Sequence, residues 1–428
     1  MNHSEQSQCA THGGACDSSK GVLFLAFVAA MGGFLFGYDA AVINGGEQQI
    51  QSVWGLSATM HGLVMSAALW GTVLGALFGG KLTDVWGRKK TLIAVSVLYL
   101  VSAVWSAVAT GPQTLIAARF LGGLGIGLST VVSPVYISEI SPAESRGRLG
   151  ALFQLNIVIG MVMSQVVNWA IGTAGLGEAT WRWMLGATGI PALVFTVLCP
   201  FLVESPRWLA MQRSRPTTER TDAGERFFSR ANRKPILLAF CLALFSQLSG
   251  IAVVLYFACR IFELTGCSRA TALAVTAGLT ALQGVGTLVG IRLIDRAGRK
   301  TMLVWGSAGY VFSLFSCAAA FLLQWHIIAA ASVFLFVLSH SLGMGTVIWV
   351  FISEVFPQRF RAQGQSWGCS THWIACAILT FVFPTLIAAF PAWSVFALFG
   401  VCMVGLFFWA LLVMPETKGL SLDERVVK

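Results

Sequence analysis

Residues 84–89 read DVWGRK, and residues 295–300, 211 positions further along the chain, read DRAGRK. A second motif repeats at nearly the same offset: SEISPAESRG over 138–147 and SEVFPQRFRA over 353–362 lie 215 positions apart. Two motifs that recur at almost one offset indicate that the chain contains two copies of one structural unit.

Long apolar runs lie between these motifs. The chain is 56% hydrophobic and only 11% charged, whereas soluble domains carry about 25% charged residues. Windows of about 19 residues identify twelve runs long enough to cross a bilayer, which takes about 20 residues. The sequence therefore predicts an all-α membrane protein with twelve transmembrane helices in two six-helix halves. The predicted spans are 21–43, 58–80, 91–110, 114–136, 149–171, 182–202, 235–257, 272–294, 301–323, 327–351, 364–388 and 392–414.

The motifs divide these spans into two sets of six. ESPR from Glu204 has a looser counterpart in ETKG from Glu416, so each half carries three motifs after equivalent spans. We expect an N-terminal half over 21–206 and a C-terminal half over 235–414, joined by a short linker over 207–234. Carriers built from two such repeats hold their substrate near the bilayer midplane and open to each side in turn.

Polar tails over 1–20 and 415–428 flank the spans. The first tail lacks the apolar core of a secretory signal peptide, so the run that follows is predicted to remain as the first span. The ten cysteines are scattered, and those in apolar runs act as small hydrophobes. We favour a disordered cytosolic tail over a metal site, and expect no metal or other cofactor apart from a coupling proton. The tail residues that leave a metal site open are His3, Cys9, His12 and Cys16.

The basic residues predict the orientation. Of 28 Lys and Arg, 24 fall in the tails, the linker and the loops that carry the motifs, while Arg182, Arg260 and Arg269 fall on the opposite side and Arg119 lies within a span. Basic loops stay in the cytoplasm, so we expect a multi-pass protein of the plasma membrane with both termini cytoplasmic. Because the charges sit in short loops between spans, the net charge of +10 indicates contact with a lipid bilayer and not with nucleic acid.

Several segments together resemble the sugar porter family of the major facilitator superfamily. They are GGFLFGYD from Gly32, the two D-x-x-G-R-K loops, VESPRW from Val203, QLSG from Gln247 and PETKG from Pro415. The resemblance runs from about residue 21 to 424. It implies the major facilitator fold and alternating access, with hexoses, pentoses or polyols as usual substrates and, in some members, proton coupling.

The repeated motifs also suggest a cytoplasmic gate. Arg and Glu at helix ends can form charge-assisted pairs, which we expect to hold the two halves together and to break when that side opens. Ordinary anchoring of helix ends is the alternative. The expected gate residues are Asp84, Arg88, Glu139, Arg146, Glu204, Asp295, Arg299, Glu354, Arg361 and Glu416.

Asp39 and Arg119 are the candidates for proton coupling. Each is an ionisable residue in an otherwise apolar span, which marks a functional site by default. A neighbouring Arg lowers the proton affinity of a carboxylate and desolvation raises it, so a pair whose exposure alternates can bind and release a proton. Asp at this position resembles the proton-coupled bacterial members of the family. A fixed structural ion pair is the alternative.

The resemblance also places a substrate site. Sugars require hydrogen bonds from amides and aromatic faces against the ring, and the matching residues are Phe36, Gln154, Gln247, Tyr256, Trp349, His372 and Trp373. Several positions depart from the family, because polar residues or a proline are usual where this chain has Ser246, Ala252, Thr346, His372 and Cys376. Losing donors and acceptors weakens binding of a substrate rich in hydroxyls, so we expect a less polar cavity than a glucose site.

These observations favour a monomeric secondary transporter that takes up a sugar, polyol or similar small solute with a proton. A facilitative uniporter, a carrier of an organic acid and a transporter-like solute sensor are the alternatives. The sensor is disfavoured because the chain ends shortly after its last span. We expect no enzyme, because no nucleotide-binding loop, metal cluster or nucleophile motif is present.

Overall fold

A computed structural model describes residues 19–142, 146–213, 227–357 and 360–418. Within them, twelve helical segments are long and apolar enough to cross a membrane, which confirms the predicted spans and the all-α class. Several helices extend beyond the predicted windows: α2 (Ser19–Val53) has 35 residues, about 52 Å at 1.5 Å per residue, against a hydrocarbon core of about 30 Å. The tail with His3, Cys9, His12 and Cys16, and residues 214–226 of the linker, lie outside the described residues.

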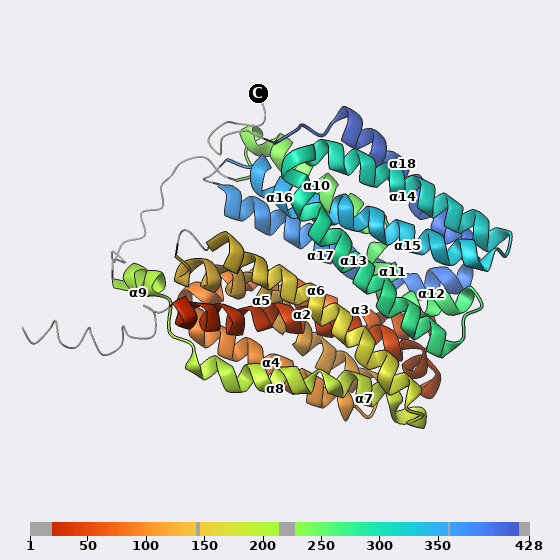
Figure 1. The fold of residues 1–428 in the computed structure, drawn as a ribbon, viewed down its shortest axis with the longest axis horizontal. Helices are drawn as coiled ribbons and strands as arrows, with labels where there is room; N and C mark the ends of the chain where they lie inside the picture. The colour runs from red at the N-terminus through yellow and green to blue at the C-terminus, as the bar shows by residue number, and fades with distance from the viewer. Residues whose placement is uncertain (1–18, 143–145, 214–226, 358–359, 419–428) are drawn as a thin grey trace, which may run out of the picture.

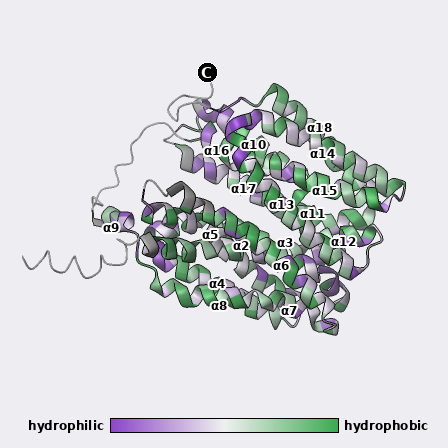
Figure 2. Cartoon of the chain, in the orientation of Figure 1, coloured by the Kyte–Doolittle hydropathy of each residue, from purple (hydrophilic) through white to green (hydrophobic). Residues whose placement is uncertain are grey.

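The chain forms two groups of helices, drawn red to green and green to blue in Figure 1. The first group comprises α2, α3 (Ala58–Trp86), α4 (Arg88–Ala107), α5 (Pro112–Ile140), α6 (Arg146–Thr173), α7 (Thr180–Ala187) and α8 (Gly189–Leu198). The short α9 (Pro206–Arg213) follows it. The second group comprises α10 (Arg233–Leu248), α11 (Ile251–Tyr256), α12 (Ala258–Leu264), α13 (Arg269–Ala297), α14 (Arg299–Leu322), α15 (His326–Leu342), α16 (Met344–Val355), α17 (Arg361–Ala389) and α18 (Ala392–Leu412). Figure 2 shows hydrophobic residues along the helices and hydrophilic residues gathered toward their ends.

The D-x-x-G-R-K motifs form matching turns. Gly87 ends α3 and Gly298 ends α13, each with φ of +90°, a conformation that favours glycine because a Cβ clashes there. In both halves the next residue, Arg88 or Arg299, begins the following helix. We call the end of the molecule that carries these two turns the motif end, and the opposite end, which carries Glu47 and Arg260, the far end.

Two spans of the second half are broken near their middle. Between α10 and α11, Gly250 adopts φ of +84°, and a Cβ on it would lie 2.6 Å from the ring of Phe399. Between α15 and α16 the break falls at Gly343. Discontinuous helices at mid-membrane depth are typical of transporter substrate sites, because backbone is tolerated there only where it is buried or lines a cavity.

The two halves pack together mainly at the far end. One hydrophobic cluster joins second-half side chains to Val42, Ile50, Val64 and Trp181 of the first half, which lie toward the far end. The remaining core of the first half, from Leu25 to Leu202, is a separate cluster. In Figure 1 the two groups of ribbons accordingly diverge toward the left, where α9 lies.

Candidate functional site

A cavity of about 760 Å³ lies between the two halves. Its lining includes Gly80 of α3 and Gln365 of α17, which lie within two turns of the motif ends of their helices. Toward the far end the lining stops at Ile251 and Tyr256 of α11. The cavity therefore extends from the middle of the molecule toward the motif end. The seven residues predicted to bind substrate all line it: Phe36, Gln154, Gln247, Tyr256, Trp349, His372 and Trp373.

Aromatic side chains pack around His372 of α17. The ring centroids of Trp349 and Trp373 lie 4.9 and 5.2 Å from that of His372, both edge-on. Phe36 of the first half lies 5.9 Å from Trp373, so this contact crosses between the halves. Gln247 Nε2 lies 2.9 Å from Nε2 of His372. Indole and phenyl faces beside amide groups suit a ring with apolar faces and polar edges.

Several buried polar atoms of this lining have no hydrogen-bond partner within the described residues. They are Oε1 of Gln165, Gln247, Gln283 and Gln365, and Oγ of Ser246. Buried amide oxygens left unpaired are costly, so these side chains are candidates for rearrangement toward a ligand in the cavity. Each of the four amides carries both a donor and an acceptor, which suits hydroxyl groups.

Sequence reasoning missed four of the polar lining residues: Gln165, Gln283, His340 and Gln365. Each is a polar residue within a predicted span, which was the available signal. Which face of its helix each residue occupies is a tertiary property. His340, for example, contacts the Tyr310 hydroxyl through Nδ1.

The positions that depart from the family fall into two groups. Ser246, Ala252 and Cys376 line the cavity, so the predicted loss of hydrogen-bonding groups falls on its surface. Thr346 instead donates its hydroxyl to the Ser341 carbonyl at 2.6 Å, across the break at Gly343. The described lining contains no Asp, Glu, Lys or Arg, so the cavity is polar without being charged.

Asp39 and Arg119 form a buried ion pair just behind this lining. Arg119 NH1 lies 2.6 Å from Asp39 Oδ1, and NH2 donates to the Asp39 backbone carbonyl at 2.9 Å. Their side chains are 4% and 2% exposed. Within the described residues, Oδ2 of Asp39 and Nε of Arg119 lack hydrogen-bond partners. Ala40 and Ala41, which follow Asp39 in the chain, line the cavity.

The motif end of the first half carries a cluster of charged groups centred on Arg88. Its guanidinium contacts Glu139 at 2.9 and 3.0 Å and Asp84 at 3.1 Å. Glu204 accepts the backbone N–H groups of Arg88 and Lys89 at the start of α4, where the helix dipole favours an anion.

The second half repeats this cluster. Arg299 contacts Glu354 at 2.8 Å and Asp295 at 3.2 Å, and Glu416 accepts the backbone N–H groups of Arg299 and Lys300. Partial burial acts to raise the pKa of the Glu416 carboxyl, but four backbone hydrogen bonds outweigh it, and the pKa lies below its ordinary value. The side chains of Arg146 and Arg361 lie outside the described part of the structure.

The location of these clusters differs from the expectation that their pairs join the two halves. Every ion pair at the motif end in the described residues lies within one half: Arg88 with Asp84 and Glu139, and Arg299 with Asp295 and Glu354. The reason is geometric, because Arg88 begins the helix after its own turn and reaches the end of α5 in the same half. Both clusters are formed while the cavity extends to this end, so opening here does not require their rupture.

Ion pairing between the halves occurs at the far end. Arg260 of α12 donates to Glu47 of α2 at 2.9 Å, and Arg269 donates to the Gly45 carbonyl at 3.0 Å. The Cys259 backbone N–H donates to Asn44 Oδ1 at 3.1 Å. Sequence reasoning placed Arg260 and Arg269 on this side but assigned them no partner, since the residues they contact are more than 200 positions away.

Comparison with known proteins supports this arrangement. The family model "Sugar (and other) transporter" matches residues 25–224 and 210–426. The probable metabolite transport protein CsbC of Bacillus subtilis is 32% identical, over 95% of this chain and 94% of its own length. The D-xylose-proton symporter of Escherichia coli K12 is 30% identical, over 95% of each chain. The structure of the xylose transporter XylE from E. coli in an inward open conformation matches with a TM-score of 0.83 and 28% identity, over 94% of this chain and 99% of that chain. The chain therefore belongs to the sugar transporter family of the major facilitator superfamily.

Proposed function

We propose that this protein transports a neutral sugar or polyol across the plasma membrane together with a proton, by alternating access. The observation that carries the proposal is the cavity between the halves, which aromatic and glutamine residues line without a charged side chain. An anionic substrate would lack a counter-charge there, and burying an unpaired charge is costly. This argues against an organic acid.

The proton is assigned to Asp39. The carboxylate lies behind the cavity wall at Ala40 and Ala41, close enough for movement of α2 to respond to an occupied cavity. Its free Oδ2 can take a proton, while Arg119 supplies the counter-charge when the proton leaves. A relative that carries D-xylose with a proton supports coupled transport over facilitated diffusion.

The motif end is assigned to the cytoplasm, with both termini on that side and the halves bounded at about 21–206 and 235–414. The cavity then faces inward in this conformation. The charged clusters around Arg88 and Arg299 each hold helix ends of their own half together. We propose that they control closure by meeting the opposite half when the motif end shuts. A monomer suffices, because both halves of the site come from one chain.

The test is uptake into proteoliposomes of a panel of labelled pentoses, hexoses, polyols and organic acids, with and without an imposed pH gradient. The proposal expects neutral polyhydroxyl compounds to be taken up and to accumulate only when a pH gradient is present. Uptake of organic acids alone would contradict the neutral substrate. Equal final levels with and without the gradient would indicate a uniporter.

A further inference from the structure

A buried charged cluster at the far end has no part in the function proposed above. Glu47 of α2 places Oε1 2.9 Å from Nε of Arg260 and Oε2 2.9 Å from Nε2 of His61, which lies on α3. The side chains of Glu47 and His61 are fully buried, while that of Arg260 is 18% exposed. Glu47 therefore sits between one permanent cation and one side chain that becomes a cation on protonation.

His61 is incompletely satisfied in this conformation. Despite the short distance to Glu47, neither ring nitrogen makes a well-oriented hydrogen bond within the described residues. The ring packs edge-on against Phe257 at 5.9 Å. The other charged or titratable groups nearby are Arg269, which donates to the Gly45 carbonyl, and Cys259, which contacts Glu263.

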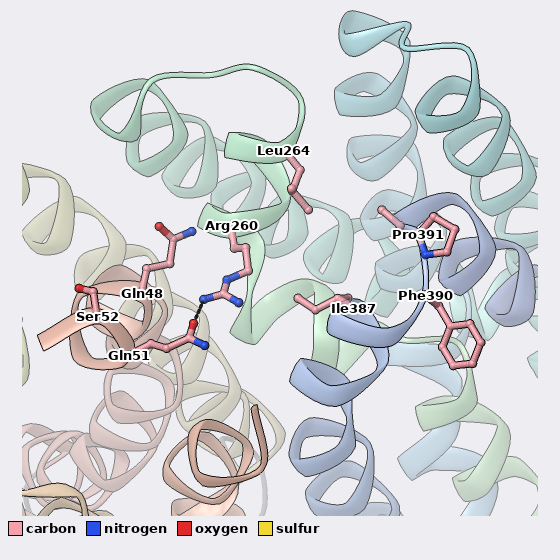
Figure 3. Close-up of a pocket in the computed structure, with 9 residues that line it drawn as sticks. Gln48, Gln51, Ser52, Arg260, Leu264, Ile387, Phe390 and Pro391 are labelled. Atoms are coloured by element: carbon pink, nitrogen blue, oxygen red, sulfur yellow. Dashed lines mark hydrogen bonds between the residues drawn. The ribbon is translucent and has the colours of Figure 1, made fainter. Parts of the chain in front are cut away.

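Arg260 separates this cluster from the far-side solvent. A pocket of about 510 Å³ opens at the far end, lined by Gln48 and Gln51 of the first half and by Arg260 and Ile387 of the second. Figure 3 shows the Arg260 guanidinium between these side chains, bonded to Gln51. Glu47 and His61 do not line the pocket, so withdrawal of Arg260 would expose them to water.

The distribution of these residues between the halves determines what happens on opening. Glu47 and His61 belong to the first half and stay together, whereas Arg260 belongs to the second half and leaves. With Arg260 gone, the carboxylate loses one counter-charge, and His61, 2.9 Å from Glu47 Oε2, is the side chain of the same half in contact with it that can become positively charged. A proton on His61 restores it, and histidine is the side chain whose ordinary titration falls between pH 5 and 8.

We propose that Glu47 and His61 form a second proton-binding site, in which a protonated His61 and the guanidinium of Arg260 are alternative counter-charges for one carboxylate. The proton binds from the far side when that end is open, and closure displaces it. Acid on the far side therefore favours the state open to that side. The inference rests on the alternating-access part of the proposed function and is independent of Asp39.

The test uses the Asp39→Asn variant as background, so that the proposed coupling proton does not contribute. Leu176 and Ile327 are exposed residues of the two halves near the far end. Each is replaced by a keto-bearing amino acid that carries a spin label, so that the native thiols are not involved. The two labels report the distance across the far end. Lowering the pH from 8 to 5.5 should increase the open population. Uptake of one proton allows up to about a tenfold change in the open-to-closed ratio per pH unit.

His61→Gln should abolish this pH response, and an unchanged response in that variant would overturn the proposal. Arg260→Gln provides a second arm that does not depend on His61→Gln folding. It should open the far end at pH 8 and lose the response, because closure no longer displaces a proton; a response retained in Arg260→Gln would also overturn the proposal. If the far end opens but never responds to pH, this inference fails alone. If it opens in no variant at any pH, alternating access fails with it.

Discussion

Asp39 and Arg119 pair across 80 positions of sequence inside the first half, with both side chains almost fully buried. A buried carboxylate bound on one oxygen only can gain a proton without losing its place beside the guanidinium. Its amide counterpart keeps the size and hydrogen bonding of Asp but cannot exchange a proton.

Asp39→Asn should therefore abolish proton-driven accumulation while leaving exchange of substrate down its gradient. The measurement compares accumulation of substrate under an imposed pH gradient with exchange of substrate, both in proteoliposomes. Asp39→Glu is the control variant, because it retains a titratable group. Accumulation by Asp39→Asn driven by the pH difference alone would assign Asp39 a structural role.

Ala252 stands in the cavity lining where the resembled family has Asn. One net hydrogen bond is worth about 0.5–1.5 kcal/mol, which corresponds to about a two- to tenfold change in affinity. Ala252→Asn should lower the KM for a hexose by that factor. Ala252→Leu adds similar bulk without polar atoms and should not lower it, so equal effects of the two variants would contradict a hydrogen-bonding role.

At the scale of helices, the two motif-end clusters contain equivalent ion pairs but differ in how far these are exposed to solvent. The side chains of Arg88 and Glu139 are 5% and 10% exposed, whereas those of Arg299 and Glu354 are 11% and 23% exposed. Each cluster ties the start of one helix to the end of another within its half, so each contributes to the stability of that half in every state.

Arg88→Ala should therefore destabilise the protein more than Arg299→Ala. Breaking a buried pair by removing one partner costs about 3–5 kcal/mol because the other charge remains, and this cost falls as the exposure of the pair to solvent increases. Thermal unfolding in detergent measures the difference. The double variant Arg88→Met with Glu139→Met should recover part of the loss, and equal effects of the two Arg variants would contradict the role of burial.

At the scale of the whole molecule, the halves meet through charge and apolar packing at the far end and diverge at the motif end. We propose that the motif end is cytoplasmic, because its loops carry the excess of basic residues and positively charged loops are not readily translocated.

A reporter fused after Lys428 should be active only in a form that works in the cytoplasm. A tag inserted at Gln324, in the far-end loop between α14 and α15, should be accessible only from outside the cell. The opposite result for either fusion would reverse the assignment of the two ends and make the cavity outward-facing.

The number of helices, their division into two sets of six and the family were accessible from sequence alone. Apolar runs of about 20 residues and repeated motifs such as DVWGRK are local properties, and a span must satisfy its own backbone whatever its neighbours. The seven substrate residues were predicted from positions that match the resembled family, and all of them line the cavity.

Only the tertiary structure shows which partners the charged residues pair with and at which end of the molecule the two halves pack together. Arg88 and Arg299 were expected to bridge the halves, but they pair within them. The sequence suggested no partner for Arg260, and the structure shows that it pairs with Glu47, 213 positions away. No local pattern groups three further residues, yet helix packing places all of them in the lining of one cavity: Gln165, Gln283 and Gln365. These contacts depend on the relative placement of two rigid halves, which no local pattern in the chain encodes and which changes when the transporter moves.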